Sequence, residues 1–315
     1  MSKQIDDGGP AFAGGVNSAI CVTNTGAGCC ADGQIVNQAL SNGIYYELPA
    51  DEYFAVEALS SSGAGQILKT PAHYLLSRTQ EDEDTKQKTR GSASHAAILQ
   101  PEIFRHLYAC GPDVDLRTKA GKASWESFVN DCPPDVIHIR GAEWPLIQGI
   151  REAVWAHPIA RQLLECDGPR EASLIWTYAG TGYPMKARVD LPATPLRTIV
   201  DLKCLRDIRA DEFAKAIYAR GYHRQGATYQ HGTAAHNLFF DTTAFIAVEN
   251  EPPHCVIVYE LEEEAIETGW ADMRAAAEIY ARCKRSGEWP GFPCEIQKIG
   301  LPKWARSRDE SILSI

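Results

Sequence analysis

The chain has 315 residues, of which 44% are hydrophobic, and its 31 basic and 41 acidic side chains give a formal charge of −10. The apolar content excludes a chain that is disordered throughout, and no uninterrupted apolar run approaches the ~20 residues that span a bilayer. The negative charge argues against non-specific coating of nucleic acid, although it is compatible with a local basic groove.

The first part of the chain differs from the rest. Residues 1–42 are rich in Gly, Ala, Asn and Ser and lack hydrophobic periodicity, so we expect a flexible leader there. The Gly-rich segment 26–30 lacks the preceding strand and the following Gly-Lys-Ser/Thr of a phosphate-binding loop. We expect an ordered domain over residues 43–306 and a tail over residues 307–315.

Two features predict a cytoplasmic protein that is not attached to a membrane. Residues 1–20 contain no continuous apolar core of the kind found in secretion signals. The ten cysteines are scattered and form no C-x-x-C pair, which argues against a zinc ribbon or a redox motif and fits a reducing compartment.

The region from residue 60 to residue 166 is predicted to be mainly helical. Ser60, Ser61 and Ser62 supply N-cap candidates for a helix that ends before Pro71, and Pro71 fits the first turn of the next helix. The predicted helices cover residues 60–70, 71–76, 91–99, 117–131 and 142–166, the last interrupted at Pro158, and the charged residues 81–90 are predicted to form a solvated loop.

Strand patterns follow after residue 170. Residues 171–178 are rich in β-formers, residues 183–191 alternate apolar and polar side chains, and with residues 197–204 they predict a β-meander. Helices are expected at 210–220, 222–236 and 262–285, strands at 243–249 and 254–260, and an extended segment packed on the body at 290–304. A small mixed sheet flanked by helices predicts an α/β or α+β domain.

The third of these strands carries the residues best suited to catalysis. The two-residue period puts Asp201 and Lys203 on one face, and Asp190 would lie beside Asp201 if the neighbouring strands pair. Two carboxylates and a lysine suit a Mg²⁺ ion held against a phosphate. When an Asp-x-Lys tripeptide occurs alone, an ion pair on a solvent-exposed face of the sheet is a commoner explanation than a catalytic site. Hydrophobic residues flank both aspartates, however, which favours a site at the core sheet.

These residues resemble a known nuclease core. Residues 189–190, followed shortly by residues 199–203, resemble the PD-(D/E)xK motif, whose acidic residues bind metal and polarise water. Gln225 and Tyr229 are similar to the QxxxY motif of the RecB-type branch, and they share one helix face. Residues 90–95 resemble the G-[ST]-A-x-H helix of that branch, whose histidine is a metal ligand.

The order of motifs from residue 60 to residue 304 resembles the RecE-like (exonuclease VIII) exodeoxyribonucleases of phages and prophages. The segments that carry this resemblance are residues 62–73, 221–225, 289–292 and 301–304. It implies a restriction-endonuclease-like core and Mg²⁺-dependent digestion of linear double-stranded DNA, with Mn²⁺ as a substitute. It further implies 5′ to 3′ digestion that leaves 3′ overhangs for recombination, a ring-shaped homo-oligomer with a tetramer as the expected size, and a single-strand-annealing partner.

The resemblance also implies a role for individual residues. From the residues alone, His95 would be a core histidine on an apolar helix face, and a solvated Glu171 and surface ion pairs of the arginines stay open as alternatives. The implied metal ligands are His95, Asp190, Asp201, the Leu202 carbonyl and Glu171; the implied catalytic residues are Asp190, Asp201, Lys203, Gln225 and Tyr229; the candidate DNA contacts are Arg188, Arg220 and Arg224.

Some features depart from the family or leave rivals open. Asp201 stands where Glu is commoner, and the chain lacks the clustered cysteine trio that holds an iron–sulfur cluster in some relatives, so we expect no cluster. An endonuclease or single-strand nuclease, or a catalytically silent DNA-binding or assembly protein, are the alternatives. Residues 186–230 are net basic and residues 249–288 net acidic, which in a ring predicts a basic lining and an acidic exterior.

Overall fold

A computed structural model describes residues 40–79 and 86–301 of the chain. The predicted leader and tail therefore lie outside the described residues, apart from residues 40–42. Among the helices of the described part, none combines the length and the apolar composition needed to cross a bilayer.

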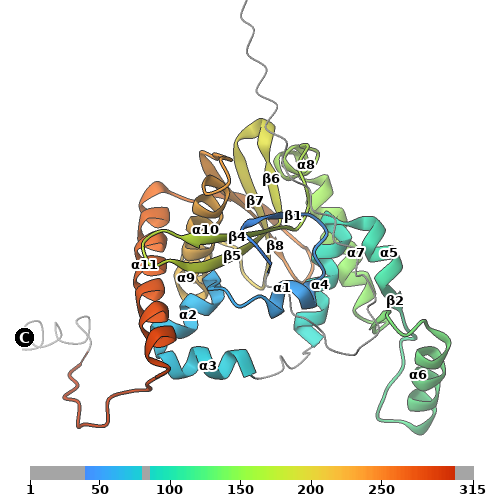
Figure 1. Ribbon diagram of the computed structural model, residues 1–315. Coiled ribbons are helices and arrows are strands. Elements are labelled where there is room, and N and C mark those ends of the chain that lie inside the picture. The colour runs from blue at the N-terminus through green and yellow to red at the C-terminus, as the bar shows by residue number, and fades with distance from the viewer. Residues whose placement is uncertain (1–39, 80–85, 302–315) are drawn as a thin grey trace, which may run out of the picture. The chain divides into compact units, whose positions relative to one another are not determined.

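The first of the two larger sheets is built around a hairpin (Figure 1). Strand β4 (Ala172–Tyr178) pairs antiparallel with β5 (Tyr183–Val189), with Ala172 opposite Val189. Strand β1 (Gly43–Tyr45) adds antiparallel to the other edge of β4. The hairpin confirms the strand predicted from the alternation of residues 183–191, but both of its faces are covered: Lys186 and Asp190 of the polar face are buried as well.

The second sheet has four strands in the order β6-β7-β8-β9. Strands β7 and β8 are parallel, and the two outer pairs are antiparallel. A separate pair of short parallel strands, β2 and β3, lies in the segment that also contains α6. The bounds are β6 Leu191–Ala193, β7 Thr198–Leu205, β8 Thr242–Glu249, β9 Val256–Glu260, β2 Tyr108–Cys110 and β3 Ile137–Ile139.

Asp190 joins the two sheets. Its carbonyl oxygen accepts a hydrogen bond from Glu171 N at 3.0 Å, next to the first sheet, and its Oδ2 accepts one from Leu202 N of β7 at 2.9 Å. The predicted single meander is therefore wrong in one respect. The chain leaves the β4–β5 ladder at Asp190 and continues as β6 in the other sheet, with Leu191 opposite Val200.

The helices agree with most of the predicted ones. Ser60 Oγ accepts from Gly63 N at 3.1 Å and caps α2, and Pro158 separates α7 from α8, as predicted. The helices are α1 Ala50–Ala55, α2 Ser61–Lys69, α3 Pro71–Thr79, α4 Lys86–Leu99, α5 Pro101–Leu107, α6 Lys119–Asp131, α7 Trp144–Ala156, α8 Pro158–Leu164, α9 Ala210–Arg220, α10 Tyr222–Ala234 and α11 Glu263–Ser286, with a 3₁₀ turn at Thr194–Leu196.

Helices cover both faces of the β6–β9 sheet. Apolar side chains of α4, α7 and α8 pack on one face, against Val200, Leu202 and Ile246 among others. Helix α9 and the start of α10 pack on the opposite face, around Phe213 and Phe245. Helix α10 thus lies on the face of β7 that carries Asp201 and Lys203, because those two residues alternate with the buried Val200 and Leu202.

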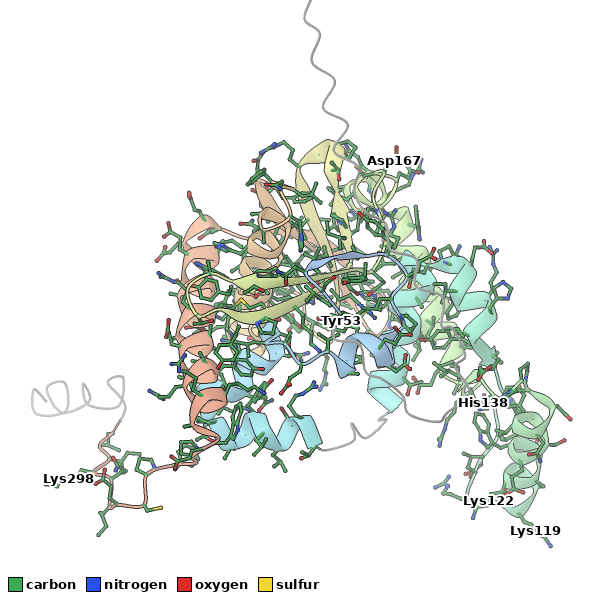
Figure 2. All side chains as sticks on the ribbon, in the orientation of Figure 1. Tyr53, Lys119, Lys122, His138, Asp167 and Lys298 are labelled. Carbon is green, nitrogen blue, oxygen red and sulfur yellow. The ribbon has the colours of Figure 1, made fainter. Side chains whose placement is uncertain are left out.

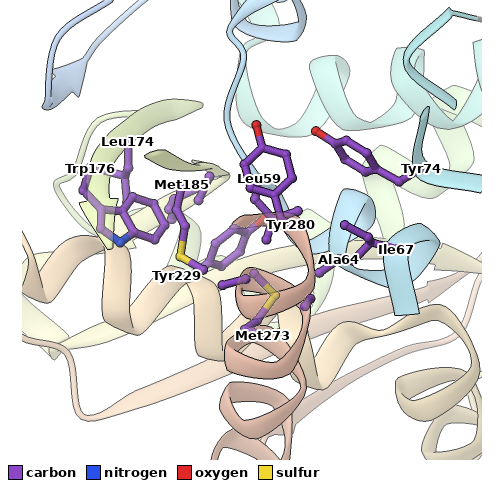
Figure 3. Close-up of a cluster of buried hydrophobic side chains, with 14 of the residues drawn as sticks. Leu59, Ala64, Ile67, Tyr74, Leu174, Trp176, Met185, Tyr229, Met273 and Tyr280 are labelled. Carbon is purple, nitrogen blue, oxygen red and sulfur yellow. The ribbon is translucent and has the colours of Figure 1, made fainter. Parts of the chain in front are cut away.

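A third apolar cluster joins the β4–β5 hairpin to helices α2, α3, α10 and α11 (Figure 3). Tyr229 of α10 and Met273 of α11 are buried in this cluster beside Trp176 and Met185 of the hairpin. Helix α10 therefore contacts both sheets, and packing rather than its sparse hydrophobic pattern fixes its position.

Two predicted segments need correction. Residues 86–90, predicted as part of a loop, form the first turns of α4, and Arg90 pairs there with Glu143 at 3.2 Å and Glu251 at 3.0 Å. Residues 81–85 lie outside the described part. The segment after α11 packs on α3 at its start. Trp289 stacks on Tyr74, Pro290 O accepts a hydrogen bond from Ala72 N at 3.1 Å, and the Phe292 ring centre lies 6.0 Å from that of His73.

Beyond Pro290 that segment is exposed. Ile296 and Ile299 have 99% and 97% of their surface accessible, and Lys298 lies on a stretch that runs away from α11 (Figure 2). The prediction that residues 290–304 pack along the body is therefore confirmed at the start of the segment and wrong for residues 293–300, whose side chains are exposed. Residues 302–304 lie outside the described part. The short elements β1, α1, α5, β2 and β3 were not predicted.

Candidate active site

Five segments of the chain bring the predicted site residues together. The β6–β7 register places Asp190 next to the part of β7 that carries Asp201, and α10 crosses the same face. His95 lies on α4, Glu171 directly precedes β4, Asp190 links β5 to β6, Asp201 and Lys203 lie on β7, and Gln225 and Tyr229 lie on α10.

His95 lies between two carboxylates. Its Nε2 is 2.7 Å from Asp190 Oδ2 and its Nδ1 is 3.1 Å from Glu171 Oε1. Burial alone lowers the pKa of His95, but the Asp190 and Glu171 carboxylates outweigh it and raise this pKa well above its usual value. With a carboxylate at each ring nitrogen, this arrangement favours the imidazolium form of His95. Glu171 adopts a left-handed backbone, with φ 55°, at the point where the chain enters β4.

Asp201 and Lys203 form a second, connected group. The Lys203 ammonium pairs with Asp201 Oδ2 and donates to Gln225 Oε1 at 2.9 Å. Gln225 Nε2 donates to the Tyr229 hydroxyl at 2.6 Å, and that hydroxyl donates to Asp201 Oδ1 at 3.0 Å. The helix spacing of Gln225 and Tyr229 thus closes a ring of contacts around the two β7 residues.

Burial shapes the protonation of this second group. Burial, reinforced by repulsion from Asp190, raises the pKa of Asp201 to about 6, although Lys203 and His95 oppose the shift. Burial alone lowers the pKa of Lys203, but Asp201 and Asp190 more than compensate, so its pKa rises and it stays an ammonium. Burial and the nearby Asp201 raise the pKa of Tyr229 well above its usual value, so its hydroxyl remains a donor.

The donor set fits a divalent cation. The ligand atoms of His95, Glu171 and Asp190 all lie within 4.8 Å of one another. Asp201 lies outside this group and pairs with Lys203, so its role as a metal ligand stays a prediction. Carboxylate oxygens suit Mg²⁺ and Mn²⁺, and an imidazole nitrogen is a good ligand for transition metals. The His95, Glu171 and Asp190 side chains can therefore hold a divalent metal ion.

Leu202 takes part in the site through its backbone. Its amide N–H donates to Asp190 Oδ2 and so fixes the carboxylate that also contacts His95. The metal-ligand role of its carbonyl stays a prediction. Glu171, for which the sequence left a solvated position open, lies in the acidic cluster instead.

Two of the three candidate DNA-contacting arginines have structural partners. Arg188 donates to Ser173 Oγ at 3.0 Å and to Leu48 O at 2.7 Å, and its guanidinium lies 4.4 Å from the centre of the Tyr53 ring. Arg224 pairs with Asp272 of α11 at 3.0 Å. We leave both out of the DNA-contacting set that we propose below. Arg220, at the exposed end of α9, stays a candidate.

A cavity of about 1030 Å³ opens beside Lys203, at the upper end of the ~300–1,000 Å³ of typical small-ligand sites. Gln225, Tyr229 and the serines before and within α2 form part of its wall. Among the described residues that line it, the basic ones outnumber the acidic ones; the basic residues are Arg78, Lys186, Arg188, Lys203 and Arg220, and the acidic one is Asp51.

Sequence reasoning missed two residues next to this site. Lys186 is buried and donates to three carbonyl oxygens of the segment that contains α1, and its Nζ lies 4.7 Å from the ring centre of Tyr53. Tyr222 lies against Lys203, with the ammonium 4.5 Å from the ring centre. The position of Tyr222, one turn before Gln225, was the available signal; Lys186 had none, because its partners are more than a hundred residues away.

Comparisons with known proteins place the chain in a family. Residues 60–299 match the family described as "PDDEXK-like domain of unknown function (DUF3799)". The crystal structure of a "putative exonuclease" from Eubacterium rectale is similar at 14% identity, with a TM-score of 0.54, over 84% of this chain and 99% of that chain. At such an identity the likeness shows the fold alone.

A second solved structure is more distant. A phage-related exonuclease from Haemophilus somnus 129PT is 11% identical over 73% of this chain and 96% of that chain, and its TM-score of 0.32 is too low to carry an argument. No curated protein matches the sequence. The family match spans more than half of the chain and includes every residue of the candidate site. The chain therefore belongs to the PDDEXK-like family DUF3799, and its mixed α/β core is that of the PD-(D/E)xK nuclease superfamily.

Proposed function

We propose that this protein is a metal-dependent exodeoxyribonuclease that degrades linear double-stranded DNA. The observation that carries the proposal is the cluster of His95, Glu171 and Asp190 beside the Asp201–Lys203 pair, next to a cavity with a mainly basic wall. A cation site and a fixed ammonium at one place are what hydrolysis of a phosphodiester requires.

Each residue of the cluster has a chemical task in this proposal. His95, Glu171 and Asp190, with Asp201, would hold the metal ion, which when bound would neutralise phosphate charge and lower the pKa of a water ligand. Lys203 would stabilise the charge that develops on the phosphate and position the nucleophile. Gln225 and Tyr229 hold Lys203 and Asp201 in place through their hydrogen bonds.

The finer features of the proposal rest on the resemblance of the sequence motifs. We propose Mg²⁺ as the metal, with Mn²⁺ as a substitute, and digestion from 5′ to 3′ that leaves 3′ overhangs for phage-type recombination. We also propose a cytoplasmic, ring-shaped homo-oligomer, with a tetramer as the size to test by sedimentation equilibrium, and a single-strand-annealing partner. The mainly basic cavity wall supports DNA as the substrate.

The proposal is tested by nuclease assays on end-labelled linear duplex DNA and on a covalently closed circle. We expect Mg²⁺-dependent release of nucleotides from the linear duplex, and loss by at least about 100-fold in Lys203→Ala, since one electrostatic group in a dry site is worth about that much. Lys119→Ala, on the distant α6, is the matched control. Activity that resists a chelator, or equal activity of Lys203→Ala and wild type, would refute the mechanism, and cleavage of the circle would indicate an endonuclease.

A further inference from the structure

The Lys203 ammonium is surrounded by a carboxylate oxygen, an amide oxygen and two aromatic rings. Asp201 and Gln225 supply the oxygens. The Nζ atom lies 4.5 Å from the ring centre of Tyr222 and 5.7 Å from that of Phe245. Both distances are within the ~6 Å at which a ring face attracts a cation.

The two rings are held firmly. Phe245 is fully buried on β8, directly beside Asp201 in the β7–β8 register. The Tyr222 ring packs on Phe245 at 5.8 Å and on Phe213 of α9 at 6.2 Å, measured between ring centres. These contacts fix the ring in front of the ammonium rather than leaving it free to turn.

The backbone at Tyr222 contributes to this placement. Tyr222 is the first residue of α10, and Gly221 before it has φ 74°, in the left-handed region that favours glycine. The sharp turn between α9 and α10 therefore presents the tyrosine ring to β7, one helical turn before Gln225. The ring and the amide approach Lys203 from the same helix.

The ring, and not the hydroxyl, makes the contact. Within the described part of the chain no hydrogen bond to the Tyr222 hydroxyl is found, whereas the hydroxyl of Tyr229 on the same helix has two. Tyr222 also lines the cavity, so its ring lies at the boundary between the ammonium and the space where we place DNA.

We propose that Tyr222 is a positioning residue for Lys203: its ring face holds the ammonium at the point where charge develops during cleavage. The inference rests on the proposed nuclease function and deepens it. A positioning role predicts an effect on turnover rather than on substrate binding, and it predicts that any residue with the same ring serves.

The kinetic test compares Tyr222→Phe and Tyr222→Leu in the full-length protein, with linear duplex DNA and Mg²⁺. We expect Tyr222→Phe to behave like wild type, and Tyr222→Leu to lower kcat about tenfold with little change in KM. In a Lys203→Ala background, Tyr222→Leu should cost nothing further, because the two residues act through one contact. Tyr218→Leu, an exposed tyrosine of α9, is the control and should keep full activity.

A second measurement does not depend on activity. With ¹³C-labelled lysine, the ε-methylene signal of Lys203 should show an upfield ring-current shift in wild type and Tyr222→Phe. The shift should become smaller in Tyr222→Leu, where only the more distant Phe245 ring remains. Near-UV circular dichroism checks that each variant is folded. If wild type has no nuclease activity, the proposed function fails while this shift still decides the contact. Equal kcat losses in Phe and Leu variants, additivity with Lys203→Ala, or an unchanged Lys203 signal would overturn the proposal.

Discussion

At the scale of single residues, Lys186 combines burial with an unusual set of partners. Its Nζ donates to the carbonyl oxygens of Tyr53 at 2.8 Å, Phe54 at 3.2 Å and Val56 at 2.9 Å, and so attaches the α1 segment to β5. Burial, with repulsion from Arg78 and Arg188, lowers the pKa of Lys186 to about 7. The Lys186 side chain thus holds part of the cavity wall together and does not project into the cavity as a free cation.

This lowered pKa predicts a pH dependence of stability. In the unfolded chain Lys186 keeps its proton up to the ordinary value of 10.5, whereas the folded protein releases it near pH 7. Between these values the unfolded state binds more protons, so the free energy of unfolding rises with pH. We expect the free energy of unfolding of wild type minus that of Lys186→Met, measured by urea denaturation at pH 7, 8 and 9, to increase with pH. Parallel pH profiles would mean that the carbonyl oxygens keep Lys186 protonated.

At the scale of elements, the site depends on the close crossing of α10 and α11. A Cβ on Gly269 of α11 would lie 2.2 Å from the carbonyl oxygen of His223, in the first turn of α10. This backbone cannot move away without shifting the turn that positions Tyr222 and Gln225. Glycine at this position therefore sets the distance between the two helices.

The crossing predicts opposite outcomes for two glycine-to-alanine changes. Gly269→Ala should lower the free energy of unfolding by about 1–3 kcal/mol, as overpacking does, and should reduce nuclease activity. Gly91 lies inside α4, where an added Cβ would meet open space. Gly91→Ala should therefore raise the free energy of unfolding by about 0.5–1 kcal/mol, because alanine favours the helix. Thermal and urea denaturation of the three proteins checks both. A Gly269→Ala protein as stable as wild type would contradict the packing argument.

The same elements show how far the sequence alone can reach. Strand β4 was predictable from its β-forming residues, and strands β5 and β7 from a two-residue alternation, from which the shared face of Asp201 and Lys203 follows. That both faces of these strands are covered was not predictable, because the covering helices come from distant parts of the chain. The pairing of His95 with Asp190 joins residues 95 positions apart, and only the motif resemblance pointed to it. The partners of Arg188 and Arg224 lie near α1 and on α11, far away in the sequence, so no local pattern predicts them.

At the scale of the whole molecule, the charge of −10 and the basic cavity wall lead to a prediction about salt. An acidic protein binds DNA only where cations are concentrated, and the affinity then falls as salt displaces those contacts. Arg220 lines the cavity at the end of α9, where a phosphate can reach it. Its contribution should therefore be electrostatic and independent of DNA sequence.

Arg220→Ala should weaken binding to linear duplex DNA and reduce the slope of log affinity against log salt by about 1, the change expected when one phosphate contact is lost. Fluorescence anisotropy in EDTA, which prevents cleavage, measures this between low and moderate salt. Arg117→Ala is the control, since Arg117 is a 91% exposed side chain paired with Asp115 outside the cavity. If both variants keep the wild-type slope, DNA does not contact this wall through Arg220, and its path must follow another part of the basic segment that surrounds Lys203.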